Sequence, residues 1–117
     1  MIVCAIDELM FSIKISTAAK ALGVDVYFER SADKVLTTIR EKQPTLVIFD
    51  LNSARLEPMD AIAALKNDPA LKSVRTLGYV SHVDAETISA ARRAGIDQVM
   101  ARSAFADGLH NILTNAT

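Results

Sequence analysis

The carboxylates of Asp7, Glu8 and Asp50 are the side chains of this sequence best suited to chemistry. Asp50 ends the run Leu46–Asp50, in which four large apolar residues stand immediately before the carboxylate. Asp7 and Glu8 follow a second apolar run, over residues 2–6, in the same way. Carboxylates held close together repel each other, and a hard divalent cation is the simplest way to offset them. Mg²⁺ suits a site with few carboxylates and several waters, and it neutralises the oxygens of a transferring phosphoryl group.

The same carboxylates also have structural interpretations that involve no chemistry. Asp50 could cap or bracket the loop after it, which begins with Asn52 and Ser53. Asp7 and Glu8 could stabilise the N-terminus of the next helix through its dipole. The fold decides between these interpretations, because it determines whether the three side chains meet.

Short apolar runs and longer segments with helical spacing alternate along the chain. The runs have the length and composition of strands buried on both faces of a parallel sheet. They cover residues 2–6, 24–28, 45–50, 75–80 and 96–101. Gly78 interrupts the fourth of them. The first helix is predicted over Leu9–Leu22, where Leu9, Ile13 and Ile15 recur at helical spacing.

Capping residues and helix breakers set the predicted boundaries of the other helices. Ser31 and Ser103 are suitable N-caps for the second and last helices, and the fourth helix is expected to begin at Asp84 or its neighbours. Pro58 suits the first turn of the third helix, and Gly23 and Gly95 are expected to end the first and fourth helices. The last helix is expected to turn four apolar side chains inward, those of Phe105, Leu109, Ile112 and Leu113.

Five strand–helix units in regular alternation predict an α/β fold. The expected architecture is a doubly wound, five-stranded parallel sheet with helices on both faces, a flavodoxin-like three-layer sandwich. Strand order 2-1-3-4-5 is the common one for a chain of this size, and its switch point lies between the first and third strands. Those two strands end at Asp7-Glu8 and at Asp50. The topology therefore predicts that the three carboxylates share one crevice.

Length and composition indicate one ordinary globular domain spanning residues 1–117. The net charge of -1 gives no electrostatic case for binding nucleic acid or an anionic membrane. No apolar run approaches the roughly 18 residues that a membrane helix needs, and no signal peptide is visible. The single cysteine, Cys4, lies in an apolar run, which predicts a buried thiol and a reducing, cytoplasmic setting.

The remaining polar side chains favour structural roles. Tyr27 and Tyr79 are predicted to pack through their rings while their hydroxyl groups stay in water. His82 is interpreted as a solvated loop residue after the fourth strand. The sequence contains neither a dinucleotide-binding glycine motif nor a P-loop, so it gives no support for nucleotide binding.

Several stretches, taken together in order and spacing, resemble the receiver domain of bacterial response regulators. They are residues 2–8, 46–50, 58–71, 80–84 and 94–105. The resemblance implies that Asp50 accepts a phosphoryl group from a histidine kinase or a small phosphodonor. It also implies that Asp7 and Glu8 form the acidic pair that holds Mg²⁺, together with Asp50 and the backbone carbonyl of Asn52.

The acidic pair aligns with the family in two ways. Counting back from Asp50 without a gap places Ile6 and Asp7 on the pair, with Glu8 just beyond. A one-residue deletion places Asp7 and Glu8 on it. Both alignments keep at least one carboxylate.

Two positions depart from the family pattern. The Thr or Ser that bonds the phosphoryl oxygen is replaced by Val80, and Ser81 lies one residue further on, where a strand side chain faces the other way. Arg102 stands where the family has Lys and is followed by Ser103 instead of Pro. Arginine keeps the positive charge but has a different shape, and it can clamp a phosphate in a bidentate manner.

Three functions remain open on these residues. The first is a working receiver in phosphorelay signalling, with no enzyme activity beyond gaining and losing the phosphoryl group. The second is a non-phosphorylated pseudo-receiver that acts as a protein–protein interaction module. The third is an α/β enzyme that uses the carboxylates directly. With no output domain expected, the family resemblance implies a signalling partner, or a homodimer, bound through the fourth helix, fifth strand and fifth helix, roughly residues 85–111.

Overall fold

A computed structural model describes residues 1–81 and 84–116, so His82 lies outside the described residues. The sheet is parallel throughout, has five strands and has the order β2-β1-β3-β4-β5, as predicted. Its strands are β1 (Ile2–Ala5), β2 (Val26–Phe28), β3 (Leu46–Asp50), β4 (Arg75–Val80) and β5 (Gln98–Ala101). The helices are α1 (Leu9–Leu22), the 3₁₀ turn η1 (Ala32–Lys34), α2 (Val35–Lys42), α3 (Pro58–Asn67), α4 (Ala85–Ala94), α5 (Arg102–Asp107) and α6 (Leu109–Asn115).

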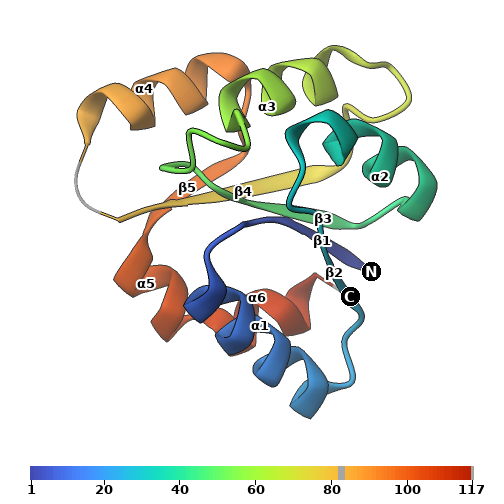
Figure 1. The fold of residues 1–117 in the computed structure, drawn as a ribbon, viewed down its shortest axis with the longest axis vertical. Coiled ribbons are helices and arrows are strands. Elements are labelled where there is room, and N and C mark those ends of the chain that lie inside the picture. The colour runs from blue at the N-terminus through green and yellow to red at the C-terminus, as the bar shows by residue number, and fades with distance from the viewer. Residues whose placement is uncertain (82–83, 117) are drawn as a thin grey trace.

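Helices cover both faces of the sheet, which gives the predicted three layers (Figure 1). On one face lie α1, α5 and α6, and their core cluster includes Phe11, Ile15, Phe105 and Leu113. On the other face lie α2, α3 and α4, and their core cluster includes Val35, Ile39, Ile62 and Leu65. The strands between the two clusters contribute alternate side chains to each, because successive residues of a strand point to opposite faces.

Burial explains why the apolar runs predicted the central strands. Every residue of β1 is at most 2 % exposed, as are the residues of β3 before Asp50. The two edge strands are shorter than predicted, with β2 beginning at Val26 and β5 at Gln98. Their side chains are partly exposed, so sequence hydrophobicity marks their ends poorly.

The predicted helix ends at glycine and proline are confirmed. Gly23 and Gly95 follow α1 and α4 with φ of 69° and 104°, the left-handed backbone that glycine adopts without strain. Pro58 is the first residue of α3. Asp84 caps α4, where its carboxylate accepts the Thr87 backbone N–H at 3.2 Å.

Neither predicted serine caps its helix through its side chain. Ser31 occupies the N-cap position of η1 as predicted, but the local hydrogen bond is made by its backbone N–H, to Glu29 Oε2 at 3.2 Å. The last helix begins at Arg102, directly after β5, so Ser103 lies within its first turn. Gly108 then separates this region into α5 and α6 instead of one continuous helix.

Two of the apolar residues that marked α1 in the sequence do not face the core. Leu9 is 66 % exposed and Ile13 is 56 % exposed, so both lie on the outside of the helix. The buried positions of α1 are Phe11, Ser12, Ile15 and Ala19. Ser12 and Ala19 are small, so their burial is only weakly signalled by sequence hydrophobicity.

Two predictions from composition can be compared with the described residues. Cys4 is fully buried, and burial raises the pKa of its thiol far above the usual range, as expected for an inert structural cysteine. Within residues 1–81 and 84–116, no helix combines the length and the apolar character that crossing a bilayer would require.

Candidate functional site

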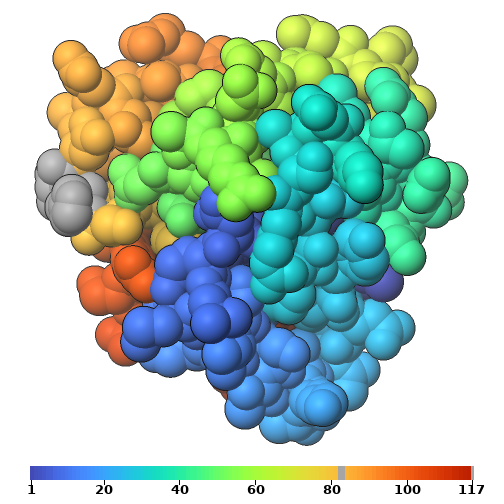
Figure 2. Space-filling model, viewed as in Figure 1, coloured from blue at the N-terminus to red at the C-terminus, as the bar shows by residue number. Residues whose placement is uncertain are grey.

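Asp7 and Asp50 lie at the same edge of the sheet, as the topology predicted. Strand β1 pairs with β3 in parallel register, with Ala5 opposite Phe49, so the carboxyl ends of both strands emerge together. In Figure 2 the blue surface near the start of the chain meets the green surface of the loop after β3 at this edge. A hydrogen bond from Ser53 Oγ to Asp7 Oδ1, 3.1 Å long, joins the two segments.

Asp50 is a half-buried carboxylate at the end of the central strand. Its Oδ1 accepts the backbone N–H of Asn52 at 3.0 Å. Burial raises the pKa of Asp50 above its usual range, because a less polar environment disfavours the charged form. The Asn52 hydrogen bond and the charge of Arg102 lower that pKa, whereas the charges of Asp7 and Glu8 raise it. Asp50 therefore lies within the electrostatic influence of the predicted site residues Asp7, Glu8 and Arg102.

Ser53 organises the loop that follows Asp50, a role that the sequence did not indicate. Its side chain is bound to Asp7, and its Oγ also accepts the Leu56 backbone N–H at 3.3 Å. The residue is only 8 % exposed. A serine in an apparent loop is usually a turn former, and only the three-dimensional contact with Asp7 gives it a place in this site.

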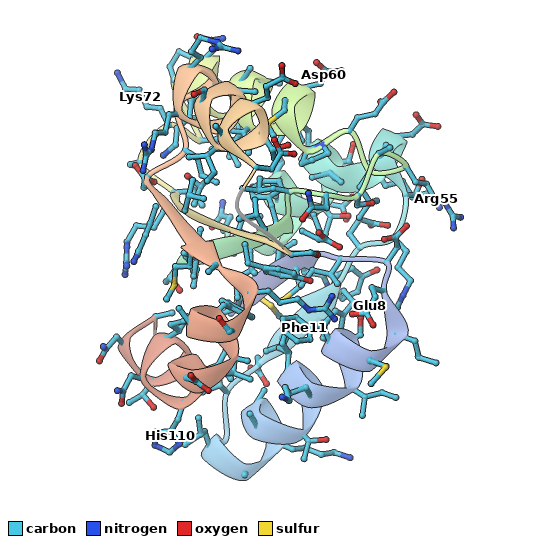
Figure 3. The ribbon with its side chains drawn as sticks, turned by 90° about the vertical axis from the view of Figure 1, so that its left-hand side faces the viewer. Glu8, Phe11, Arg55, Asp60, Lys72 and His110 are labelled. Carbon is cyan, nitrogen blue, oxygen red and sulfur yellow. The ribbon has the colours of Figure 1, made fainter. Side chains whose placement is uncertain are left out.

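The Glu8 carboxylate binds the N-terminus of α1 and Arg102. It is the N-cap of α1, where Oε1 accepts the Met10 N–H at 3.0 Å and Oε2 accepts the Phe11 N–H at 2.9 Å. The same Oε2 lies 3.3 Å from Arg102 Nη2. Figure 3 places Glu8 and Phe11 at the start of α1. The helix-stabilising interpretation of Glu8 is therefore confirmed, and its carboxylate is turned toward the helix and Arg102.

Arg102 is stacked on an aromatic group as well as paired with Glu8. Its Cζ lies 4.2 Å from the centroid of the Phe11 ring, a cation–π arrangement that suits the planar guanidinium. The Phe11 ring contacts Tyr79, with centroids 5.0 Å apart, and Tyr79 stacks on Phe105 at 4.9 Å. Neither Phe11 nor Tyr79 was predicted to belong to the site, because aromatic residues in apolar segments indicate core packing first.

The two positions considered for the family's hydroxyl group lie in different surroundings. Val80 is buried in the core cluster under α2, α3 and α4, and its side chain has no hydroxyl. Ser81 is exposed, and its backbone N–H donates to Asn52 Oδ1 at 2.6 Å. That bond ties the loop after β3 to the end of β4.

The predicted metal ligands fit a divalent cation only in part. Among the residues that the structure describes, no group of three or more His, Cys, Asp or Glu side chains could hold a metal ion. Glu8 is occupied as a cap and an ion-pair partner. Asp7 and Asp50 are hard oxygen donors at one sheet edge, and one or two carboxylates completed by water is a common Mg²⁺ environment. Asp7 and Asp50 without Glu8 therefore fit the chemistry of Mg²⁺, whereas the predicted ligand set that includes Glu8 does not.

Comparison with known proteins gave matches among solved structures only. No model of a known protein family matches the chain, and no curated protein sequence matches it. A response regulator from Hahella chejuensis is 14 % identical, with a TM-score of 0.85 over 97 % of this chain and 91 % of that chain.

Two further structures carry information on ligand state. The Mn²⁺-bound form of the response regulator Rcp1 is 15 % identical, with a TM-score of 0.79 over 99 % of this chain and 96 % of that one. The phosphorylated cyanobacterial phytochrome response regulator RcpA is 20 % identical, with a TM-score of 0.80 over 97 % and 88 % of the two chains. Over nearly its whole length, the chain therefore has the receiver fold of response regulators.

Proposed function

We propose that this protein is a receiver-type signalling domain in which Asp50 accepts a phosphoryl group. The position of Asp50 carries the proposal: the carboxylate ends the central strand, half-buried, next to Asp7 and within the influence of Arg102. A carboxylate oxygen of Asp50 bonds to phosphorus while the bond from phosphorus to the leaving atom breaks. The leaving group departs with that electron pair, and Asp50 becomes an acyl phosphate.

The chain's own residues have distinct parts in this proposal. Arg102 supplies positive charge for the phosphoryl oxygens, and a planar guanidinium can bind two of them at once. Asp7, Asp50 and the backbone carbonyl of Asn52 would hold Mg²⁺. When bound, this ion offsets the negative charge of the carboxylates and the phosphoryl group. Ser53 orients Asp7 through the 3.1 Å hydrogen bond.

The proposal also covers the source of the phosphoryl group and the way in which the protein passes on the signal. A histidine kinase or a small phosphodonor in the cytoplasm supplies the phosphoryl group, and the protein has no further enzymatic activity. It signals by binding a protein partner, or a second copy, through α4, β5 and α5. The phosphorylated RcpA supports phosphorylation for this fold, and the Mn²⁺-bound Rcp1 supports binding of a divalent metal. The proposal involves neither nucleic acid nor membrane.

A second candidate, the pseudo-receiver, is favoured by one specific observation. Arg102 is paired with Glu8 and stacked on Phe11, so a cation of the chain itself offsets one of the carboxylates beside Asp50. In that function the same face binds a protein partner permanently, and Asp50 is not modified.

Phosphoryl transfer to Asp50 distinguishes the two candidates. The protein is incubated with acetyl phosphate and Mg²⁺ and analysed by intact mass, and Asp50→Asn is compared with Asp60→Asn, which changes an exposed aspartate of α3. A receiver gains one phosphoryl group in the wild type and in Asp60→Asn but not in Asp50→Asn. No phosphoryl gain from acetyl phosphate or from a phosphorylated histidine kinase, with the fold intact by NMR, rejects the receiver and leaves the pseudo-receiver.

A further inference from the structure

The hydroxyl group of Tyr79 is buried without a hydrogen-bond partner. Tyr79 is 1 % exposed, and among residues 1–81 and 84–116 its hydroxyl is the one fully buried side-chain polar atom that lacks a partner. The prediction of a water-exposed hydroxyl was therefore wrong for this residue. Leaving such a group unpaired costs about 1–3 kcal/mol. Phenylalanine would fill the same space without that cost, so the hydroxyl calls for an explanation outside packing.

The ring of Tyr79 is fixed on the side of the sheet that carries Asp50. It lies against Phe11 and Phe105, with centroid distances of 5.0 and 4.9 Å. Asp50 and Tyr79 are paired residues of neighbouring parallel strands, which lie about 4.8 Å apart. Ile48, two residues before Asp50, belongs to the same core cluster as Tyr79. Alternation along a strand therefore directs Asp50 and Tyr79 to one side.

The charges around the phenol are those of the candidate site. Burial raises the pKa of Tyr79 far above its usual range, and the negative charge of Asp50 raises it further, with a smaller contribution from Glu8. Arg102 acts in the opposite direction. The hydroxyl thus stays protonated and is a donor without an acceptor, within the field of Asp50 and Arg102.

We propose that the Tyr79 hydroxyl donates a hydrogen bond to the phosphoryl group carried by Asp50. It supplies the donor that Val80 lacks, from the opposite face of the same strand. This inference rests on the proposed receiver function. A phosphoryl group on Asp50 brings oxygen acceptors to a site where the Tyr79 hydroxyl is an unpaired donor. A hydrogen bond from this hydroxyl to a phosphoryl oxygen would offset the free energy lost by burying the hydroxyl unpaired.

Beryllofluoride, which mimics the phosphoryl group on a carboxylate, tests the inference together with Mg²⁺. The affinity of the wild type is measured by NMR and compared with that of Tyr79→Phe and of Tyr27→Phe, which changes the partly exposed tyrosine. A lost hydrogen bond to a charged group corresponds to an affinity about 10- to 100-fold weaker in Tyr79→Phe. Tyr27→Phe should bind as the wild type does. The Tyr79 Cζ resonance of the wild type should also shift on binding.

The outcomes separate this inference from the proposed function. Asp50→Ala must abolish binding, which establishes that beryllofluoride occupies the acceptor. If the wild type and Tyr79→Phe bind equally and the Tyr79 resonance stays in place, the inference is wrong and the receiver function stands. If the wild type does not bind, both are rejected.

Tyr79→Phe keeps the ring contacts and removes only an unpaired group, so it should be at least as stable as the wild type. A clear loss of stability in Tyr79→Phe would instead indicate a structural role.

Discussion

Glu8 Oε2 lies 2.9 Å from the backbone nitrogen of Phe11 and 3.3 Å from Arg102 Nη2. One carboxylate oxygen thus joins the first turn of α1 to the start of α5, across 94 residues of sequence. The pair is about one-third exposed on each side, so its direct contribution to stability is small, typically below about 1 kcal/mol. Its importance lies in the orientation of Arg102, which it holds beside the candidate acceptor.

Mg²⁺ binding should depend on Asp7 and not on Glu8. We expect Asp7→Asn to weaken Mg²⁺ binding at least tenfold, because it removes one of two available carboxylates. Glu8→Gln should leave the affinity within about threefold, since Glu8 is held by the helix terminus and Arg102. NMR titration of backbone amides measures both affinities. Equal losses in the two variants would mean that Glu8 leaves its cap to join the metal site.

Asp50→Asn should stabilise the fold at neutral pH. The folded-state pKa of Asp50 is raised, so ionisation destabilises the folded state as the pH rises past the ordinary carboxyl range, near 4. In urea unfolding at pH 7, the free energy of unfolding of Asp50→Asn should exceed that of the wild type. The difference should be larger than the roughly 0.5 kcal/mol that surface substitutions usually cause. The difference should disappear as the pH falls below about 4, where Asp50 is neutral in both states.

Asp97→Asn is the matched control, because we expect it to change the stability of the fold in the opposite direction. At Asp97 burial alone would raise the pKa, but the hydrogen bonds from Lys66 and Thr76 outweigh it, and the pKa is lowered. Its ionised form therefore stabilises the fold above the ordinary carboxyl pKa, and that stability is lost as the pH falls through the folded pKa. Asp97→Asn should be less stable than the wild type at pH 7. If Asp50→Asn and Asp97→Asn changed the free energy of unfolding at pH 7 in the same direction, the opposite pKa shifts of the two carboxyl groups would be contradicted.

Gly78→Ala should destabilise the protein by about 1–3 kcal/mol through overpacking. A Cβ at this position would lie 2.6 Å from Leu51 Cγ and 2.8 Å from Ile96 Cδ1, in the packed core on the α3–α4 side. Urea unfolding gives the cost. The substitution should cost less in a Leu51→Ala background, which makes room for the methyl group. An unchanged cost there would show that the strain does not come from Leu51.

Substitutions on α1 should separate its exposed and buried apolar residues. Ile13→Ser should change the free energy of unfolding by no more than about 0.5 kcal/mol, because Ile13 is 56 % exposed. Ile15→Ala should cost about 2–5 kcal/mol, because Ile15 is fully buried against the sheet. Thermal and urea unfolding measure both. Similar costs at the two positions would contradict the orientation of α1.

The fold was predictable because the strands carry a strong local signal. The run Leu46–Asp50 is buried on both faces, and parallel strands of this kind have few alternatives. Gly23, Pro58 and Asp84 also act through their own backbone or nearest neighbours, so their positions followed from the sequence.

Features that depend on distant contacts were not predictable. Ser103 has the right chemistry for a cap, but β5 runs directly into the helix at Arg102. Asp50 and Asp7 were placed correctly because strand order alone determines their position. The pairing of Glu8 with Arg102 and the role of Ser53 depend on side-chain partners far away in the sequence, which apolar periodicity does not encode.

The aromatic stack also gives the protein a built-in optical reporter. The chain contains no tryptophan and two tyrosines, so tyrosine emission is not masked. Tyr27 is 40 % exposed, whereas Tyr79 is buried and its ring contacts those of Phe11 and Phe105. In a Tyr27→Phe background, all tyrosine fluorescence therefore originates from Tyr79, the cross-strand neighbour of Asp50. Events at the carboxylate become readable in real time, without an attached dye.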